Sequence, residues 1–384
     1  MYKQNYTQQN YNSIKNDYIK LYSSTYKYTP EEINFINKDY KNLCSDKYRY
    51  IPAIISPKKR IIVFGDIHGD YNLCVTLFLK AQLIEEKGGK YQWIGNDTYV
   101  VQVGDQIDRC RPLPNLPCNK PETTLNDEAN DIIIMELFND LDYQARQVGG
   151  AVISLLGNHE LMNVVGHMDY VSYLGFEQFR NYKDLLNPQK TFSDGIDARK
   201  HAFKAGNEYA KMMGCSRLPA VIIGSNLFVH AGIVDALIEE IQLKGMADFE
   251  TINIKIRKWL LGLLDQNSVN KIISYSPNSM FWTRNLGNIP PRVDMEDPRC
   301  KDNISNVLKM FNIGAMFIGH TPMSFTHGDF GGSTCSNRVW RIDNGSSAAF
   351  NAYDKSYAQT GTRDMYRTPS YIEILNDNEY NVYH

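Results

Sequence analysis

Residues 61–70 read Ile61-Ile62-Val63-Phe64-Gly65-Asp66-Ile67-His68-Gly69-Asp70, an apolar run that passes directly into the polar string GDIHGD. The apolar residues are β-branched or aromatic, which is typical of a buried strand. Glycine then permits a tight turn. Asp66 and His68 are two residues apart, so both side chains can point to the same side of an extended strand end. The stretch predicts a strand that delivers a carboxylate and an imidazole to one place.

Four more apolar runs end in short polar strings of the same kind. They are GDQIDR at residues 104–109, GNHE at 157–160, VHAG at 229–232 and GHTP at 319–322. Together the five strings contain four of the eight histidines of the chain. Loops at the carboxyl ends of strands in an α/β sheet meet at one crevice. We therefore expect the five strings to form a single site.

Between the strings, apolar residues at helical spacing alternate with strand patterns, which predicts an α/β core. Closely spaced strand patterns at residues 221–223 and 227–229 indicate a mixed arrangement of two sheets. Residues 1–55 are polar and rich in Tyr and Asn, and we expect a partly flexible extension there, with an arm over the first 28 residues. Residues 56–384 are expected to form one domain, with a helical cap inserted at about 161–217.

The five strings supply side chains suited to two divalent metal ions that share one bridging carboxylate. The expected ligands are Asp66, His68 and Asp105 for one ion, and Asp105, Asn158, His230 and His320 for the other. Carboxylate and imidazole ligands suit Mn, Fe or Zn better than Mg or Ca. The set contains no cysteine, which argues against a closed structural zinc site.

Such a pair of ions predicts hydrolysis of phosphomonoesters. Two metals roughly 3.5–4 Å apart can lower the pKa of a shared water and clamp phosphoryl oxygens, so an activated hydroxide attacks in line. His159 is the natural acid for the leaving group, and Asp108 is placed to fix its tautomer. Arg109 is expected to form a bidentate contact with phosphate.

The strings together resemble the motifs GDxHG, GDxxDRG, GNHE, HGG and GH of the PPP phosphatases, in the calcineurin-like metallophosphoesterase superfamily. The chain is closer to the Shewanella-like protein phosphatase branch of that family. That likeness is carried by four further stretches: residues 155–163 (LLGNHELMN), 169–171 (DYV), 281–284 (FWTR) and 341–343 (RID). It covers about residues 60–375, and several ordered motifs match together.

The resemblance implies a metallophosphoesterase four-layer fold, in which a central mixed β-sandwich is flanked by helices and the dinuclear site lies at the carboxyl ends of strands. It implies the same six metal ligands, the acid pair His159 and Asp108, and phosphate contacts from Arg109, Asn158 and Arg284. Its substrates would be proteins or peptides phosphorylated on serine, threonine or tyrosine. The chain departs from the family at Leu156, where eukaryotic-type members have arginine, and at Cys110, where glycine is expected.

Two other functions stay open at this point. A related PPP branch uses the same metals to hydrolyse diadenosine tetraphosphate and similar nucleotides. A phosphoprotein-binding module without activity is a third reading, although such a protein would usually have lost a ligand.

Composition excludes some classes of partner and suggests a compartment. The formal net charge of −2 gives no basic footprint for nucleic acid, and no apolar run is long enough to span a bilayer. The seven cysteines lack a regular spacing, so we expect no disulfide framework, a reducing compartment and a cytoplasmic location. Cys110 and Cys118 are expected to be reduced thiols rather than a redox switch. Glu160 is expected to accept hydrogen bonds behind the ligands, and Asp343 to do so or to cap a strand end.

Overall fold

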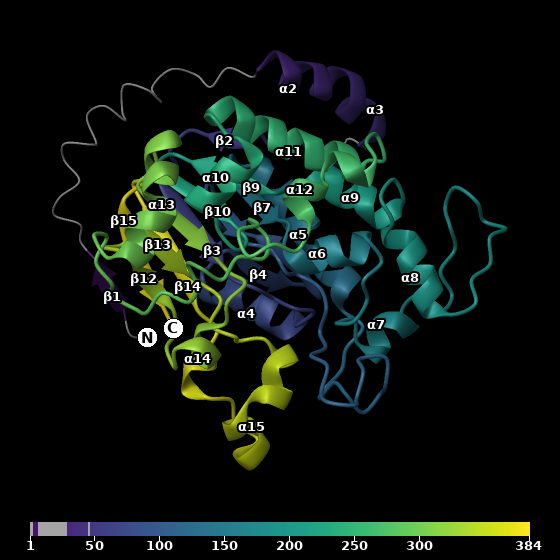
Figure 1. Cartoon of the computed structure of the whole chain (residues 1–384). Helices are drawn as coiled ribbons and strands as arrows, with labels where there is room; N and C mark the ends of the chain where they lie inside the picture. Colours follow the sequence, from purple (N-terminus) through teal and green to yellow (C-terminus); the bar gives the residue numbers. More distant parts are fainter. Residues whose placement is uncertain (1–2, 7–28, 45–46) are drawn as a thin grey trace.

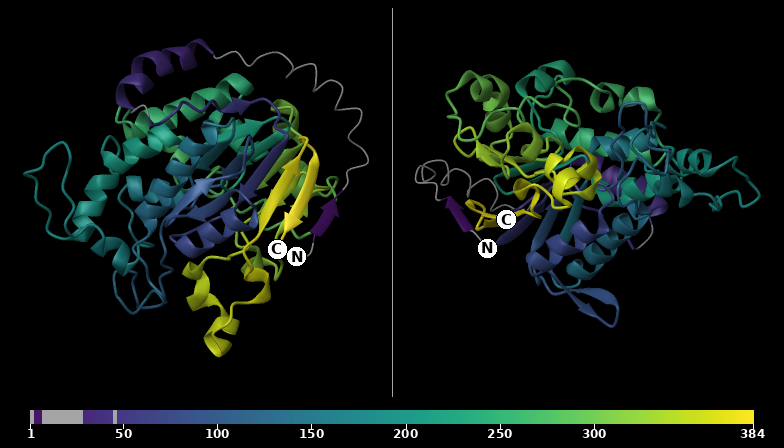
Figure 2. Two further views of the ribbon diagram at one scale, coloured as in Figure 1. Left: turned by 180° about the vertical axis from the view of Figure 1, so that it is seen from behind. Right: turned by 90° about the horizontal axis from the view of Figure 1, so that it is seen from below.

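The computed structural model describes residues 3–6, 29–44 and 47–384, and within these it contains two large β-sheets packed face to face (Figure 1). The flexible arm expected over the first 28 residues lies outside this description, apart from residues 3–6. Helices lie on the two outer faces of the sheet pair, as the views in Figure 2 also show. The predicted arrangement of four layers, a mixed β-sandwich flanked by helices, is confirmed.

The first sheet has seven strands and carries three of the five polar strings. Its four strands β3, β6, β7 and β8 run parallel, and β14, β15 and β1 add an antiparallel edge. In spatial order the strands are β1 (Lys3–Tyr6), β15 (Glu379–Tyr383), β14 (Tyr371–Leu375), β3 (Arg60–Phe64), β6 (Tyr99–Gln102), β7 (Ala151–Leu155) and β8 (Arg217–Leu218).

The second sheet has six strands and carries the other two strings. Strands β10, β11 and β13 are parallel, and β9 joins β10 in an antiparallel hairpin, formed by the two closely spaced strand patterns of the sequence. In spatial order the strands are β12 (Gly332–Thr334), β13 (Val339–Arg341), β11 (Ala315–Ile318), β10 (Asn226–Val229), β9 (Ala220–Ile223) and β2 (Ile54–Ile55). A separate hairpin pairs β4 (Ile84–Lys87) with β5 (Lys90–Trp93).

Side chains alternate between the two faces of each strand. This alternation explains why one apolar layer forms between the sheets and one more on each outer face. Ile61 and Val63 of β3 point between the sheets, where they join a core that includes Phe228 of β10. Ile62 and Phe64 point to the other face and pack against helices. Successive side chains of a strand face opposite sides, so a continuous apolar run is buried on both.

Helices cover both outer faces of the sandwich. The first sheet is covered by α4 (Tyr71–Lys80) and α5 (Asp131–Arg146), and the second by α10 (Asp235–Ile241), α11 (Met246–Leu260) and α13 (Pro298–Met310). Residues between β7 and β8 form α6 (Asn158–Val164), α7 (Tyr173–Glu177), α8 (Gly195–Phe203) and α9 (Glu208–Ser216). The remaining helices are α2 (Pro30–Asn34), π-helix η1 (Phe35–Tyr40), α3 (Lys41–Leu43), η2 (Gln266–Ser268), α12 (Asn270–Ile273), α14 (Met323–Thr326), η3 (Ala348–Tyr353), α15 (Lys355–Thr360) and η4 (Met365–Arg367).

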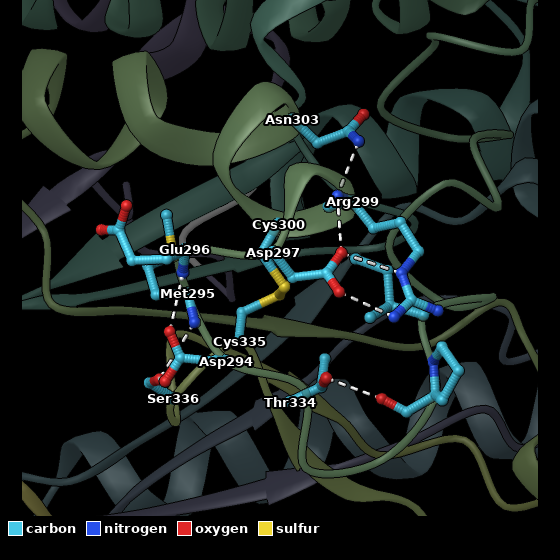
Figure 3. Close-up of a disulfide and its surroundings, with 12 residues drawn as sticks. Asp294, Met295, Glu296, Asp297, Arg299, Cys300, Asn303, Thr334, Cys335 and Ser336 are labelled. Atoms are coloured by element: carbon cyan, nitrogen blue, oxygen red, sulfur yellow. Dashed lines mark hydrogen bonds and ion pairs between the residues drawn. A yellow bond between two sulfur atoms is a disulfide. The ribbon is translucent and has the colours of Figure 1, made fainter.

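Three disulfides correct the expectation of reduced cysteines. They join Cys44 to Cys215, Cys110 to Cys118 and Cys300 to Cys335, with Cα separations of 5.5 to 5.8 Å. The partners are 171, 8 and 35 residues apart, so the fold sets the pairing and no regular spacing announces it. Figure 3 shows the third bond, which ties α13 to the turn before β13.

These bonds also remove the argument for a reducing, cytoplasmic compartment, because stable disulfides are rare there. Among the described residues, no helix has the length and apolar character needed to cross a membrane.

Candidate metal centre

The polar strings follow strands that end at the same edge of the sandwich. Strands β3, β6 and β7 are parallel neighbours, and Asp66, Asp105 and Asn158 come directly after their ends or one turn later. In the second sheet β10 and β11 are also parallel neighbours, and they lead into His230 and His320. Parallel order within each sheet therefore brings side chains from five distant parts of the chain to one end.

The side chain of Asn158, which follows a strand of the first sheet, contacts two histidines that follow strands of the second sheet. Its Oδ1 atom lies 2.8 Å from Nε2 of His230 and 3.0 Å from Nδ1 of His320. Nε2 of His230 is also 3.3 Å from Oδ2 of Asp105. All four side chains are buried. The structure thus brings together the four residues expected for one ion.

The residues expected for the other ion also lie close to Asp105. Nε2 of His68 is 3.8 Å from the Oδ2 atoms of both Asp66 and Asp105. Two groups of side chains have ligand atoms within 4.8 Å of one another, His68 with Asp105 and His159, and Asp105 with His230 and His320. Asp105 belongs to both groups, which is the place of the bridging ligand predicted from the sequence.

Backbone carbonyls fix the orientation of the three histidine rings, as is typical of metal ligands. Nδ1 of His68 lies 3.3 Å from the carbonyl oxygen of Ile107, and Nδ1 of His230 lies 2.9 Å from that of Val103. At His320 the roles are exchanged, because Nε2 lies 3.2 Å from the carbonyl oxygen of Trp282. A ring nitrogen that donates there leaves the other nitrogen as a lone pair directed into the cluster.

The electrostatics of the cluster fit a bound cation. Burial holds the pKa of His320 well below its usual range, so its ring is neutral. Its Nδ1 lone pair then faces the Asn158 oxygen, a second acceptor, and a cation shared by the two atoms would satisfy both. Burial, together with the nearby Asp343 carboxylate, raises the pKa of Asp66 well above its ordinary value. Such crowding of buried carboxylates is costly unless a positive charge compensates it.

Two buried carboxylate oxygens beside the cluster also lack protein donors. Neither Oδ1 of Asp66 nor Oδ2 of Asp343 accepts a hydrogen bond from any described residue. Oδ1 of Asp343 accepts from the backbone N–H of Gly345, so this residue caps the strand end with one oxygen and leaves the other uncommitted. The donor set and these unsatisfied atoms fit the two divalent ions expected from the sequence.

The backbone at the site adopts conformations that are costly for residues with a side chain. His68, Asp105, Asp108 and His320 all have positive φ, between 47° and 72°. Non-glycine residues in this region cluster at functional sites, where the surrounding fold holds them. Gly157 illustrates the crowding, because a Cβ atom there would overlap the Asp105 carboxylate.

Glu160 joins two of the ligand loops from behind. Its carboxylate accepts the backbone N–H groups of Asp105 at 2.9 Å, Gln106 at 2.8 Å and Gly157 at 2.6 Å. It is fully buried. The carboxylate therefore fixes the loop after β6 against the start of α6, the accepting role expected from the sequence.

His159 lies next to the ligand cluster and faces Asp108. Nδ1 of His159 is 2.8 Å from Oδ2 of Asp108, and its Nε2 is 3.8 Å from Oδ2 of Asp105. The Asp108 carboxylate is held in turn by the side-chain amide of Asn163, at 2.9 and 3.1 Å, and by the buried Arg199 guanidinium at 3.5 Å. The predicted pair is thus formed, with the Nε2 side of the ring turned to the cluster.

The cluster opens into a cavity of about 650 Å³ whose wall carries two arginines, Arg111 and Arg284. Arg109 does not line it. Its guanidinium donates instead to the carbonyl oxygens of Gly69 and Asn126, at 3.0 and 2.8 Å. The geometry therefore does not bring the expected Arg109 to the wall of this cavity, whereas Arg111, two residues later, lies there.

Sequence reasoning also missed the aromatic character of the cavity wall. The lining includes Tyr170, Tyr275, Trp282, Phe325, Phe350 and Tyr353. The guanidinium of Arg111 lies 4.5 Å from the ring centre of Phe350 and 5.6 Å from that of Tyr170. The rings come from four separate stretches of the chain, so no local pattern marks them as one wall.

Comparison with known proteins agrees with this site. The profile of the calcineurin-like phosphoesterase family matches residues 59–324, more than half of the chain. The chain belongs to that family. This calcineurin-like phosphoesterase is 37% identical to protein R398 of Acanthamoeba polyphaga mimivirus over 235 residues, which span 58% of this chain and 92% of R398.

The likeness to the Shewanella-like branch is confirmed as well. Shewanella-like protein phosphatase 2 of Arabidopsis thaliana is 26% identical over 75% of this chain and 72% of its own length. Shewanella-like protein phosphatase 1 of Plasmodium berghei is 26% identical over 82% of this chain and 71% of its own. The crystal structure of a cold-active protein-tyrosine phosphatase of a Shewanella species superposes with a TM-score of 0.59 at 18% identity, covering 92% and 86% of the two chains, and shares the fold.

Proposed function

We propose that this phosphoesterase is a metal-dependent phosphoprotein phosphatase that prefers phosphotyrosine. The observation that carries the proposal is the position of the ligand cluster, which lies with two arginines in a cavity walled by aromatic rings. A phosphoryl group would bind to metal ions held by the cluster and to the two arginines. An aromatic ring attached to that group would pack against the aromatic wall of the cavity.

The cluster would hold two divalent ions. Asp66, His68 and Asp105 would bind one, and Asp105, Asn158, His230 and His320 the other. When bound, the ions supply Lewis acidity to the phosphoryl oxygens and lower the pKa of the attacking water. Manganese, iron and zinc all suit these nitrogen and oxygen ligands.

Arg111 and Arg284 would orient the phosphoryl group. Nη1 of Arg284 donates to the carbonyl oxygen of His320 at 2.9 Å, which ties this side chain to the ligand loop. Nη1 of Arg111 donates to the carbonyl oxygens of Asp108 and Cys110, at 3.1 and 2.8 Å. Each guanidinium has further N–H donors for phosphate oxygens, and charge-assisted contacts of this kind are strong.

His159 would donate the proton that the leaving oxygen needs. With Nδ1–H directed to the Asp108 carboxylate, the other ring nitrogen, Nε2, faces the cavity side of the ring, where the proton to be donated would sit. Donation of this proton offsets the negative charge that develops on the leaving alkoxide or phenoxide.

The preference for phosphotyrosine follows from the aromatic wall. Rings such as Tyr170, Trp282 and Phe350 can pack against a phenyl group by edge or offset contacts, which contribute about 0.5–1.5 kcal/mol per pair beyond area burial. A phosphothreonine side chain offers no ring for these contacts. The net charge of −2 gives no support to nucleic acid as a partner.

A substrate panel tests the proposal. Metal-stripped protein is refilled with manganese, iron or zinc and offered phosphotyrosine and phosphothreonine peptides of the same sequence, and diadenosine tetraphosphate. We expect metal-dependent release of phosphate, with the highest kcat/KM for phosphotyrosine. Faster hydrolysis of the dinucleotide would assign the aromatic wall to adenine stacking, and no hydrolysis with any metal would contradict an enzymatic role.

A further inference from the structure

A second cavity of about 640 Å³ adjoins the catalytic one and shares Pro112 and Tyr170 with it. One side is formed by Pro117 and Cys118, from the loop that the Cys110–Cys118 disulfide closes, and by Asn119, which directly follows that loop. The other side is formed by the segment after α6 and by residues of α7 and α8. Figure 1 shows these two helices beside the long loop that precedes α5. Because the two cavities share wall residues, they are parts of one continuous surface.

The deep side of the second cavity is apolar. Met168 and Phe176 are buried, and half-buried Ile196 packs against them. The rim is polar, with the exposed side chains of Asp169 and Lys200 on the cap side. Opposite charges on the rim cancel, so the cavity selects by shape and apolar contact rather than by net charge. An apolar side chain with a polar backbone has the matching chemistry.

The position of Tyr170 shows how a substrate would reach both cavities. Because Tyr170 and Pro112 line both cavities, a peptide whose phosphorylated side chain enters the catalytic cavity could pass over these two residues toward the second cavity. An extended peptide advances about 3.3 Å per residue, so a neighbour one to four residues away would lie over the second cavity. A free amino acid or a small aryl phosphate would not reach it.

We propose that the second cavity binds an apolar side chain of the phosphoprotein substrate, on one side of the phosphorylated residue. The proposal rests on the phosphatase function proposed above. Burial of one leucine-sized side chain corresponds to about tenfold or more in affinity. Binding in this cavity would thus make the phosphomonoesterase selective for particular amino-acid sequences around the phosphorylated residue.

The test compares small and extended substrates of the intact, metal-loaded protein. The small substrate is p-nitrophenyl phosphate. The extended substrates are peptides of about nine residues with central phosphotyrosine, in which leucines lie on both sides, on the amino side alone, on the carboxyl side alone or on neither. We expect leucines on one side alone to raise kcat/KM about tenfold or more, and leucines on the other side to have little effect.

Two variants locate the contact. Ile196→Glu places a charge on the apolar side, and Asn119→Trp fills the cavity from the opposite, exposed side, so a folding defect in the first does not decide the test. Each should reduce the ratio of peptide to small-ester kcat/KM to about one tenth. Leu186→Glu is the matched control, because Leu186 is an apolar residue of the cap segment that is 77% exposed and lines neither cavity. Its ratio should equal that of the wild type.

Equal kcat/KM for all four peptides would overturn the proposal, as would an unchanged ratio in both variants. If p-nitrophenyl phosphate and every peptide are inert with every metal, the phosphatase function itself fails and the second cavity loses its assigned role with it. Hydrolysis of the small ester without discrimination among peptides rejects the second cavity alone.

Discussion

Nδ1 of His159 lies 2.8 Å from Oδ2 of Asp108, and both side chains are buried beside the ligand cluster. The carboxylate has further partners in Asn163 and Arg199, so it is held in place and cannot rotate away from the imidazole. The ring is therefore fixed with one nitrogen committed and the other turned toward the cavity. In the proposed mechanism His159 is the proton donor, and its contribution depends on the leaving group.

His159→Asn should lower turnover most for esters with poor leaving groups. A positioned general acid typically contributes 10²–10⁴-fold, and the contribution shrinks when the leaving oxygen is already stable as an anion. We expect a loss of about a hundredfold or more with phenyl phosphate and a much smaller loss with p-nitrophenyl phosphate. Rates over a series of substituted phenyl phosphates measure this dependence. Parallel losses across the series would rule out the assigned role.

Asp66→Asn and His320→Ala should abolish hydrolysis and reduce the amount of bound metal. Even residues that merely orient metal ligands change affinity or activity by 10–100-fold, so loss of a ligand should cost at least about a hundredfold. Elemental analysis of purified protein should find fewer ions in both variants. The matched control is His201→Ala, which removes an imidazole that pairs with Asp184 outside both ligand groups. Full turnover and full metal content in Asp66→Asn would refute the dinuclear centre.

Substitutions of Arg111 and Arg109 should have different effects on phosphate binding and on stability. Arg111→Ala removes a guanidinium from the cavity wall and should weaken inhibition by inorganic phosphate about tenfold to a hundredfold, the range of a charge-assisted contact. Arg109→Gln removes hydrogen bonds to Gly69 and Asn126, and should lower the urea midpoint while leaving phosphate inhibition nearly unchanged. The reverse pattern would return the phosphate contact to Arg109.

The sequence predicted the fold and the cluster because both follow from local rules. Each apolar run forms a strand, and parallel strands such as β3 and β6 must end at the same edge, so the strings after them meet. The direction of an arginine in a loop follows no such rule. Arg109 and Arg111 share a short stretch that the Cys110–Cys118 bond constrains, and tertiary contacts decide which of them faces the cavity.

The disulfides were missed for a similar reason. Cys44 follows α3 and Cys215 lies in α9, and they meet because residues of the segment from α2 to Cys44 pack against residues of α11 and α9. The hydroxyl of Tyr40 donates to the carbonyl oxygen of Cys215 at 2.8 Å, which reinforces that docking. Contacts across 171 residues leave no trace in cysteine spacing.

The Cys44–Cys215 bond should stabilise the fold more than the Cys110–Cys118 bond. In the chain-entropy view, the loops of 171 and 8 residues correspond to about 5 and about 2.5 kcal/mol. Paired replacement of each set of cysteines by alanine, followed by urea unfolding, measures the difference. The first pair of replacements should give the lower midpoint. A lower midpoint for the second pair would show that strain or residual structure outweighs loop length.

We expect Asp377 to make the free energy of unfolding fall as the pH rises from about 4 to about 6. It lies in the turn between β14 and β15 and accepts the backbone N–H of Ser225 at 2.9 Å, far along the chain from any ligand. Burial raises the pKa of its carboxyl to about 6, although hydrogen bonds from Ser225 and Asn226 oppose the shift. The unfolded value is about 3.9, so the folded chain binds this proton more tightly.

The stabilisation from that proton is complete below about pH 4 and disappears as the pH rises through about 6, a difference of about 3 kcal/mol. Asp377→Asn retains an acceptor oxygen for the Ser225 N–H and suits the positive φ of 72°, but it cannot titrate. Urea unfolding at pH 4 and pH 7 should therefore show a smaller decline for this variant than for the wild type. Asn378→Ser, a neutral change in the same turn, should keep the wild-type decline. If Asp377→Asn declines as steeply as the wild type, the Asp377 carboxyl does not bind its proton more tightly in the folded chain.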